Sequence, residues 1–469
     1  MTYQIPQHID KEKIFIISRS EIEGRLEPEF YRPSIASLEK RIRSLATHRL
    51  RDYAIYIAGG ATPKKTEADK YYTDSVSGIP FLRVQNLQTT GELSLDDCVY
   101  INKDTHNGLL QRSQVAEGDL LVKITGVGRM AIASVAPKGF VGNTNQHMVV
   151  IKTGDATVSK YLARYLNLDI IERIASRHST GGTRPALDYP SLKNLPIIEG
   201  IDFSMIDEAI ILKQQKEQQA EDILNSVDDY LLGELGIELP TIRNTLKDRI
   251  FLLNRRELEG RFDPTVYKDG IKLISTKWSN VKLSKVAFVN PSGTFKGKSI
   301  ETSISFVPME VIDERFSEIT TMEETTIEQS SGFTKFRERD LLWAKITPCM
   351  QNGKSAVAKN LTNGLGCGST EFFVLRPKDE HLSIEYLHVI LHMKCVRETA
   401  MLYFGGSAGQ QRVSSSFLEN FNLPLPPKEK QVEIANHAYK MRQQAKALQE
   451  EGKAILERAK RDIEQMIIG

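Results

Sequence analysis

The sequence predicts an α+β fold in which two similar mixed α/β domains, in a pseudo-two-fold arrangement, are separated by two long helices. Three observations predict it: an order of motifs that occurs twice, short apolar runs alternating with turn residues, and two heptad stripes. A chain of 469 residues is long enough for about two to four domains, each burying its own core.

The repeat has a very long period. FIISRSEIEGRLEPEFY, from Phe15 to Tyr31, matches FLLNRRELEGRFDPTVY, from Phe251 to Tyr267, at Phe, Arg, Glu, Glu, Gly, Arg, Pro and Tyr. Further along, Asp-Leu-Leu leads into Lys-Ile-Thr in both halves, beginning at Lys123 and, with one inserted residue, at Lys345. Solenoids and propellers have units of about 20 to 50 residues, so this period predicts two globular domains instead.

Within each half, apolar runs bounded by turn residues predict strands, and longer amphipathic stretches predict helices. The predicted strands are Ile79–Val84, Asp119–Thr125 and His147–Lys152 in the first half, and Ile304–Val307, Leu341–Thr347 and Glu371–Arg376 in the second. The predicted helices are Lys160–Ser176 and Ile384–Leu402.

Two stripes of alternating four and three spacing predict the long helices. The first consists of Ile206, Ile210, Ala220, Leu224, Val227 and Leu231, with Lys213 and Glu217 at intervening seam positions. The second consists of Ile434, Ala438, Met441, Ala445, Leu448, Gly452, Ile455, Ala459 and Met466, with Asp462 interrupting it. A helix of about 30 residues spans about 45 Å, so either could separate two domains. The alternative is that each stripe packs on its own domain.

These observations predict four segments. Residues 1–202 form the first domain, 203–236 a central helix, 237–426 the second domain and 427–469 a C-terminal helix. Pro426 and Pro427 precede the last helix and favour its start.

Composition limits the classes of function. The 62 basic and 60 acidic residues give a formal net charge of +2, so no overall positive field attracts the chain to nucleic acid, and such contacts must be local or shared with partners. Four cysteines without C-x-x-C spacing fit a reducing cytoplasm. The N-terminus lacks an apolar signal region and no apolar run is long enough to span a membrane, so we expect a soluble cytoplasmic protein.

Several motifs carry a family resemblance. In the first half they are GGATPKK (Gly59–Lys65), IPFLRVQNL (Ile79–Leu87), GDLLVKITGVGRMAIA (Gly118–Ala133) and STGGTRPALDYPSLKNLPI (Ser179–Ile197). In the second they are DLLWAKITPCMQNGKSAVA (Asp340–Ala358), GSTEFFVLRP (Gly368–Pro377) and GGSAGQQRVSSSFLENFNLPLPP (Gly405–Pro427). With these motifs in duplicated order, the chain resembles the specificity subunits of type I restriction-modification systems over nearly its whole length.

The resemblance implies two target-recognition domains that each read half of an interrupted site in double-stranded DNA. It also implies that the two linking helices form an antiparallel coiled coil, which docks two methyltransferase subunits and, where DNA is cut, restriction subunits. No cofactor is expected in this chain, whereas S-adenosylmethionine, ATP and Mg are expected in the partners. The helix residues implied to dock partners are Ile206, Ile210, Leu224, Leu231, Ile434, Met441, Leu448 and Ile455. NPSGTFKGK (Asn290–Lys298) departs from the GG-x-TP form of the first half, so we expect different half-sites.

Reading a DNA sequence requires side chains that match base edges, such as Arg or Lys for guanine and Asn or Gln for adenine, while lysines also contact phosphates. The candidates in the first domain are Thr62, Lys64, Arg83, Gln85, Asn86, Lys123, Arg129, Asn143, Asn145, Gln146, Thr183 and Arg184. Those in the second are Thr294, Lys296, Lys298, Lys345, Gln351, Asn352, Lys354, Gln410, Gln411 and Arg412.

These candidates have structural alternatives. Arg83 and Lys123 lie in strand-like runs and could satisfy buried carboxylates, and Asn143 could simply form a turn. The polar segments Gly182–Arg184 and Gly409–Arg412 follow a predicted helix in both halves, which favours a shared function, although glycine after a helix is also expected from capping.

The motifs of catalytic partners are missing. Asn290-Pro291-Ser292-Gly293 is not the Asn/Asp-Pro-Pro-aromatic motif of an adenine methyltransferase, and GTFKGKS at 293–299 is one residue short of a phosphate-binding loop. His388 and His392 lack the glutamate of a HExxH site. We therefore expect a non-catalytic subunit. The competing hypotheses are a coiled-coil adaptor that bridges proteins without reading DNA, and a self-sufficient methyltransferase or nuclease with unrecognised motifs.

Overall fold

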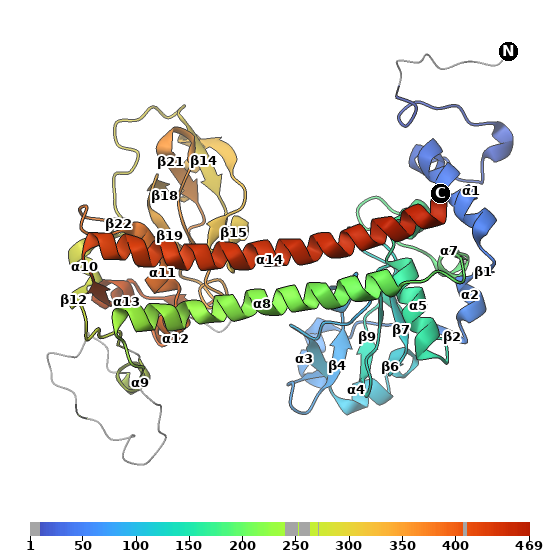
Figure 1. The fold of residues 1–469 in the computed structure, drawn as a ribbon, viewed down its shortest axis with the longest axis horizontal. Helices are drawn as coiled ribbons and strands as arrows, with labels where there is room; N and C mark the ends of the chain where they lie inside the picture. Colours follow the sequence, from blue (N-terminus) through green and yellow to red (C-terminus); the bar gives the residue numbers. More distant parts are fainter. Residues whose placement is uncertain (1–9, 240–251, 253–262, 271, 407–409) are drawn as a thin grey trace. The chain divides into compact units, whose positions relative to one another are not determined.

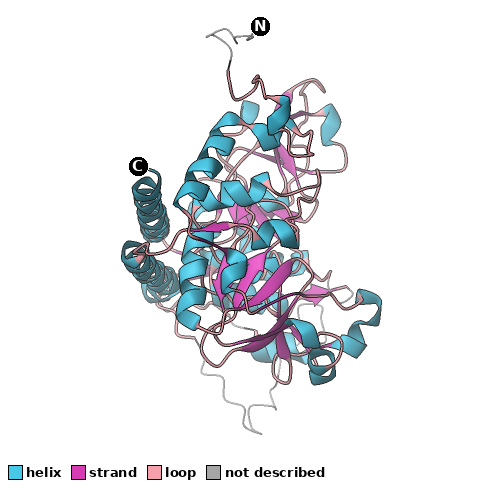
Figure 2. Cartoon of the chain, turned by 90° about the vertical axis from the view of Figure 1, so that its right-hand side faces the viewer, coloured by secondary structure: helices cyan, strands magenta, loops and turns pink. Residues whose placement is uncertain are grey.

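The computed structural model describes residues 10–239, 252, 263–270, 272–406 and 410–469. It consists of two compact units: unit 1 comprises residues 1–214 and 452–469, and unit 2 comprises residues 215–451. Strands and helices alternate along each unit (Figure 2), which confirms the predicted mixed α/β class. The second copy of the repeated motif, Phe251 to Tyr267, lies largely outside the described residues.

Unit 1 contains two main sheets. One is antiparallel, in the order β2 (Tyr56–Gly59), β10 (Met148–Lys152), β7 (Leu120–Lys123), β8 (Ala133–Val135). The other has the order β3 (Tyr72–Thr73), β5 (Val99–Ile101), β4 (Ile79–Leu82), β9 (Val141–Thr144), β6 (Gln114–Ala116), with β4 and β9 parallel. A short pair joins β1 (His48–Arg49) to β11 (Pro196–Ile197). The helices are α1 (Pro33–Leu45), α2 (Leu50–Tyr53), α3 (Ala68–Tyr71), α4 (Lys103–Asn107), α5 (Ala156–Leu166), α6 (Asp169–Arg177) and α7 (Tyr189–Lys193).

Unit 2 repeats this plan. Its antiparallel sheet has the order β13 (Ala287–Val289), β22 (Phe372–Pro377), β19 (Leu341–Ala344), β20 (Ser355–Val357). The second sheet has the order β17 (Glu323–Thr326), β14 (Ser303–Val307), β21 (Leu365–Gly368), β18 (Thr334–Arg337), and again its central pair is parallel. Short pairs are formed by β12 (Ser279–Lys282) with β25 (Asn422–Leu425), β15 (Ile312–Asp313) with β16 (Glu318–Ile319), and β23 (Phe404–Gly405) with β24 (Arg412–Val413). The helices are α9 (Pro264–Asp269), α10 (Leu283–Val286), α11 (Ile384–His392), α12 (Lys394–Met401) and α13 (Ser415–Asn420).

The two helices predicted after the central strands are each broken in two. The predicted helix Lys160–Ser176 is α5 followed by α6, and the predicted helix Ile384–Leu402 is α11 followed by α12. Leu168 and Met393, which precede α6 and α12, have extended backbone angles and fully buried side chains. The prediction of single helices was wrong because burying these two side chains in the core takes precedence over helical continuity.

The structure also corrects the pairing of the two Lys-Ile-Thr triplets. The Lys123 amide donates to the Ile132 carbonyl in one unit, and the Ala344 amide donates to the Lys354 carbonyl in the other. Lys123 is therefore equivalent to Ala344, and Lys345 stands one residue further along. Because side chains alternate along a strand, the two lysines point to opposite faces.

The long helices are α8 (Ser204–Leu235) and α14 (Lys428–Ile468), drawn in green and red in Figure 1. They pack against each other in antiparallel directions inside each unit. In unit 2, Ala220 and Leu224 cluster with Ala445 and Leu448. In unit 1, Ile206 and Ile210 share a core with Leu456 and Ile463. A Cβ on Gly452 would lie 3.3 Å from the Lys213 Cα, so glycine permits this close approach.

Most residues of the two heptad stripes are buried or partly buried in this packing. Ile206, Ile210, Leu231 and Ile434 are at most 2% exposed and belong to the core of their own unit. They hold the helices to the globular bodies, which is the packing that the alternative interpretation of the stripes described. Leu224, Met441, Leu448 and Ile455 are partly buried. Met466, at the end of the predicted stripe, is 70% exposed. In the described part of the chain, no helix has the length and apolar character needed to cross a membrane.

Candidate nucleic-acid interface

In unit 1, several of the sequence motifs meet at one edge of the β2–β10–β7 sheet. Neighbouring antiparallel strands run in opposite directions, so the end of β2, the start of β10 and the end of β7 share this edge. A Cβ on Gly60 would lie 2.0 Å from the Thr144 carbonyl oxygen, and one on Gly59 would lie 2.2 Å from the Tyr189 hydroxyl. The glycine pair therefore allows the GGATPKK segment to pack against the end of β9 and against the motif Ser179–Ile197. We call this edge, in either unit, the motif edge.

In each unit a loop with two adjacent glycines follows a helix: Gly181 and Gly182 after α6, and Gly405 and Gly406 after α12. We call each of these the glycine-rich loop of its unit. The loop of unit 1 is fixed to the motif edge by its backbone. The Leu187 amide donates to the Ile124 carbonyl (2.8 Å), and the Gly126 amide donates to the Pro185 carbonyl (3.0 Å). Asp188 then caps α7 by accepting from the Ser191 amide. The loop is thus more than a helix cap, because it is attached to a strand end.

Unit 2 attaches its glycine-rich loop in the same way. The Val413 amide donates to the Lys345 carbonyl (2.9 Å), and the Thr347 amide donates to the Gln411 carbonyl (3.0 Å). Ser414 caps α13 as Asp188 caps α7. Gly409 lies outside the described residues. Duplication has therefore preserved the attachment of the loop, although the side chains on it differ.

About half of the predicted DNA-contact residues have exposed side chains. In unit 1 these are Thr62, Lys64, Gln85, Gln146, Thr183 and Arg184. In unit 2 they are Lys296, Lys298, Asn352, Gln410 and Arg412. Gln85 and Gln146 follow the ends of the parallel strands β4 and β9, so both lie beyond the same end of that pair.

Four predicted residues of unit 1 are buried and serve its structure. Asn86 accepts from the Arg83 amide and donates to the Ser94 carbonyl, which fixes a loop. Asn143 bonds to His106 and to the Leu110 carbonyl. The Asn145 side chain accepts from the His147 amide (3.1 Å).

Lys123 is the fourth buried residue of this group. It donates to the Val127 carbonyl (2.8 Å), and burial lowers its pKa. Because these polar groups are already satisfied inside the unit, we leave all four out of the proposed DNA surface.

A further group is partly buried with internal partners. Arg83 donates to the Asp97 carbonyl, and Arg129 pairs with Asp169 and donates to the Asn167 carbonyl. Lys354 donates to the Met309 carbonyl, the Gln351 carbonyl accepts from Arg397, and Lys345 lies over the Phe373 ring. Thr294 is partly buried, and its hydroxyl oxygen has no partner among the described residues. Gln411 is half-buried.

Arg412 forms a two-pronged ion pair with Glu371. Its Nε and Nη2 donate to the two carboxylate oxygens at 2.9 and 2.7 Å, and the hydrogen bond from Arg412 lowers the pKa of Glu371. Glu371 was missed by sequence reasoning, which sought only basic and amide side chains. Its position in the sequence, directly before β22, could have identified it, because a glutamate at that place faces the motif edge.

Comparisons with known proteins agree with this geometry. Residues 276–451 match the model of the type I restriction modification DNA specificity domain. The chain is 38% identical over 160 residues to the type I restriction enzyme EcoEI specificity subunit of Escherichia coli, a stretch that covers 34% of this chain and 26% of that protein. Over this part of its sequence the chain is similar to type I restriction enzyme specificity subunits.

A second curated protein and a solved structure give further matches. The type I restriction enzyme EcoAI specificity subunit of Escherichia coli is 34% identical over 158 residues, again 34% of this chain and 26% of that protein. The matched stretch thus spans about a quarter of each curated relative. One solved structure concerns complex assembly and conformational transition of the type I R-M system. Its alignment covers 90% of this chain and 95% of the solved chain, with 17% sequence identity and a TM-score of 0.42.

The first copy of the repeated motif supports the glycine-rich loop of unit 1. Arg25 donates to the Arg177 carbonyl (3.4 Å) and the Ser179 carbonyl (3.2 Å), at the end of α6 where the loop begins. The guanidinium groups of Arg25 and Arg177 both lie on the Phe30 ring, 4.9 and 4.3 Å from its centroid. The Tyr31 hydroxyl donates to the Arg25 carbonyl. The Arg, the Tyr and the Pro before Phe30 recur in the sequence of the second copy.

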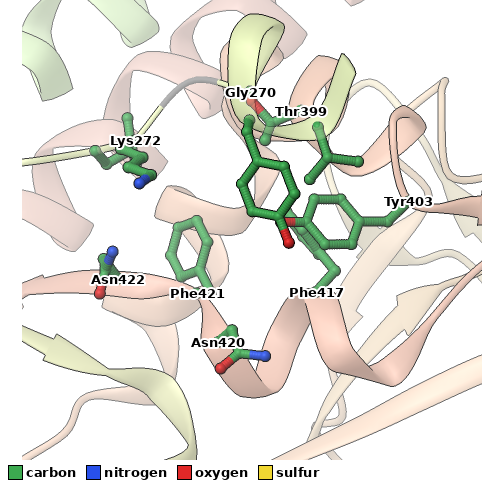
Figure 3. A pocket seen from close by; sticks show the side chains of 11 residues that line it. Gly270, Lys272, Thr399, Tyr403, Phe417, Asn420, Phe421 and Asn422 are labelled. Carbon is green, nitrogen blue, oxygen red and sulfur yellow. The ribbon is translucent and has the colours of Figure 1, made fainter. Parts of the chain in front are cut away.

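Aromatic side chains of unit 2 line a small cavity beside α12 and α13. Figure 3 shows the rings of Tyr403, Phe417 and Phe421 with Asn420 and Lys272 around it. Its volume of about 50 Å³ is well below that of typical small-molecule pockets, which is about 300 to 1,000 Å³. The cavity is therefore a packing gap and not a nucleotide pocket.

The two histidines considered as metal ligands have other roles. His388 is buried and bonds to Ser355 and Tyr439, and His392 bonds to the Glu314 carbonyl. Trp343 is buried in the core of unit 2, as expected of a packing residue. Among the residues that the structure describes, no group of three or more acidic, cysteine or histidine side chains could hold a metal ion.

Proposed function

We propose that this chain is the DNA-reading subunit of a type I restriction-modification complex and that each unit reads one half of an interrupted site. The observation that carries the proposal is the duplicated motif edge, where equivalent backbone bonds hold a glycine-rich loop in both units. A rigid attachment with variable exposed side chains is the arrangement that base reading requires, because the scaffold sets the position and the side chains set the sequence.

The two units are proposed to read different half-sites. Thr183 and Arg184 are exposed on the loop of unit 1, whereas Gln410 and Arg412 are exposed on that of unit 2. Arginine matches guanine and glutamine matches adenine in the major groove, so the two loops favour different bases. Lys64, Lys296 and Lys298 would contact phosphates.

The chain would act with partners. Its net charge of +2 supplies little long-range attraction to DNA, so methyltransferase subunits docked along α8 and α14 would provide much of the positive surface. Met205, Ile211 and Leu212 of α8 are exposed apolar side chains suited to such docking. S-adenosylmethionine would then be bound by the methyltransferase, and ATP and Mg by a cutting subunit, while this chain selects the site and carries out no chemical step.

Methylation mapping with the assembled complex tests the proposal. Replacing Gln410, Gln411 and Arg412 with alanine should relax recognition of one half-site only, and replacing Thr183 and Arg184 should relax the other. The two variants serve as controls for each other, since both alter one exposed loop of similar attachment. Equal changes in both halves would contradict independent readers.

Salt dependence separates DNA reading from a purely bridging role. Phosphate contacts release counterions, so the affinity of the complex for DNA should fall steeply with salt and should fall less steeply in a variant with Lys296 and Lys298 replaced by glutamine. An adaptor that bridges proteins without reading DNA would show the same DNA affinity with and without this chain.

A further inference from the structure

Unit 2 contains an open cavity of about 620 Å³ beside the helices α8, α12 and α14. Its lining includes Gln351 and Asn352, two of the DNA-contact candidates, but none of the residues Gln410, Gln411 and Arg412. The side chains that carry the inference are Leu224, Asn225 and Asp228 from α8, Lys394 and Arg397 from α12, and Arg442 from α14.

Arg442 is a buried cation, and one of its guanidinium nitrogens lacks a hydrogen-bond partner. Its side chain is 3% exposed, and its Nη1 has no hydrogen-bond partner among the described residues. Burial lowers its pKa because the guanidinium has lost its hydration. An unpaired buried charge is costly, so a bound anion at this place would be strongly favoured.

Comparison with unit 1 shows which group is missing. There Arg129 donates to the Asn167 carbonyl (2.6 Å), two residues before α6, and pairs with the carboxylate of Asp169, the first residue of α6. Arg397 donates to the equivalent carbonyl of His392 (3.0 Å), two residues before α12.

The first residue of α12 is Lys394, so unit 2 has a cation where unit 1 has a carboxylate. The helix start is otherwise treated alike. In both units a carboxylate on one of the long helices accepts a hydrogen bond from the first amide of the shorter helix. Glu464 accepts from the Asp169 amide in unit 1, and Asp228 accepts from the Lys394 amide (2.8 Å) in unit 2. Unit 1 therefore has a carboxylate at the first residue of this helix that unit 2 lacks, while in unit 2 the charge of Asp228 acts on both Arg397 and Arg442.

Four basic and three acidic side chains line the cavity: Arg315, Lys394, Arg397, Arg442, Glu221, Asp228 and Glu314. Once the ion pairs of Lys394 with Glu398 and of Arg315 with Glu221 are set aside, the cavity lining keeps two arginines, Arg397 and Arg442, and two carboxylates, Asp228 and Glu314. Burial lowers the pKa of His392 well below its usual value, so this histidine adds no charge near neutral pH.

We propose that this cavity binds one carboxylate side chain of a protein partner, which the guanidinium groups of Arg397 and Arg442 recognise. The flat fork of arginine matches the two oxygens of a carboxylate. A DNA backbone fits less well, because three carboxylates and the apolar Leu224 and Val227 line the same walls. The inference rests on the proposed function, in which a methyltransferase subunit docks on α8 and α14.

The first test measures the affinity of the full chain for its methyltransferase subunit. Arg442→Gln should weaken it by at least about 30-fold, since one member of a buried charge pair is removed. Arg458→Gln is the matched control, because Arg458 is on the same helix but 81% exposed. Each Asp and Glu of the methyltransferase is then neutralised in turn. One of these methyltransferase variants should lose as much binding affinity as Arg442→Gln does. Combining it with Arg442→Gln should weaken binding no further.

A second variant leaves the buried network intact. Asn225 is exposed at the cavity, so Asn225→Glu adds a repelling charge, whereas Asn225→Gln does not. Asn225→Glu should weaken methyltransferase binding by about tenfold at low salt, and less at high salt. If Arg442→Gln does not fold, this pair of variants tests by itself whether the cavity binds a carboxylate of the methyltransferase.

The outcomes separate the inference from the proposed function. If the native chain does not bind a methyltransferase subunit, the proposed function fails. If it binds, but Arg442→Gln and Asn225→Glu both stay within about threefold of the native affinity, only the carboxylate site is wrong. If these variants weaken DNA binding and leave methyltransferase binding unchanged, the cavity holds a phosphate and the inference is overturned.

Discussion

Glu39 is the carboxylate that joins α1 to the end of α6 in unit 1. It is buried and accepts from Arg43 on its own helix and from Arg177 and His178 beyond it. Burial by itself would raise its pKa, but the hydrogen bond and charge of His178, together with Arg43, outweigh burial and lower the pKa from 4.5 to about 2. The ionised form is therefore the one that the folded state prefers.

This preference predicts a pH-dependent contribution to stability. Because the folded pKa is lowered, the stabilisation is complete above about pH 4.5 and is lost as the pH falls toward about 2. Glu39→Gln should lower the free energy of unfolding by about 3 kcal/mol at pH 7, and the deficit should shrink between pH 4.5 and 2. Thermal unfolding of the full chain measures this. Glu29→Gln, at an exposed ion pair, should change little at any pH.

Arg25 links the repeated motif to the glycine-rich loop, and its role can be tested separately. Arg25→Ala removes the donors to the Arg177 and Ser179 carbonyls, so amide hydrogen exchange at residues 180–187 should become faster and recognition of the first half-site weaker. Arg25→Lys should restore part of both. Arg19→Ala, at an exposed arginine of the same motif, is the control. Unchanged exchange at the loop would show that the motif does not support it.

At the scale of elements, the long helices are held by their buried faces. Leu448 packs in a small cluster with Ala220, Phe316 and Ala445, whereas its neighbour Ala447 is exposed. Leu448→Glu places a charge in this cluster and should destabilise the helix pair of unit 2 by about 2 kcal/mol. Ala447→Glu should have almost no effect. Equal effects of the two substitutions, measured by chemical denaturation, would mean that the cluster does not hold the helices together.

At the scale of the whole molecule, the pairing of α8 with α14 suggests that helix length sets the spacer between half-sites. Lys216 pairs with Glu451, so the two chain positions lie opposite each other. Inserting seven residues after Gln215 and seven after Glu451 keeps the heptad register and lengthens both helices by about 10 Å.

The recognised spacer should then grow by about three base pairs, at about 3.4 Å per pair, while both half-sequences stay the same. Methylation mapping of this variant decides the question. A folded, active variant that keeps the native spacer would rule out a helical ruler. Inserting seven residues in only one helix is the control and should abolish activity, because the pair loses its register.

The sequence by itself determined the features that depend on neighbours along the chain. Periodicity was enough to locate β4, β7, β10, β14, β19 and β22 and both long helices, and duplication was enough to predict two similar domains. The same local signals selected Thr62, Lys64, Arg184 and Gln410, which are exposed. The predictions of strands and helices held because a run of apolar residues or a glycine-rich turn carries its own structural preference, whereas the DNA contacts of the exposed residues stay a prediction.

Only the tertiary structure decided which polar side chains are available. Asn86 and Asn143 look like base-reading residues in the sequence, yet both are buried and bonded to groups far along the chain. Lys123 and Lys345 read as equivalent, but the strand register places them on opposite faces. Arg442 of α14 and Arg397 of α12, 45 positions apart in the sequence, line one cavity. Burial and charge pairing depend on what packs from elsewhere in the molecule, and no local pattern encodes that.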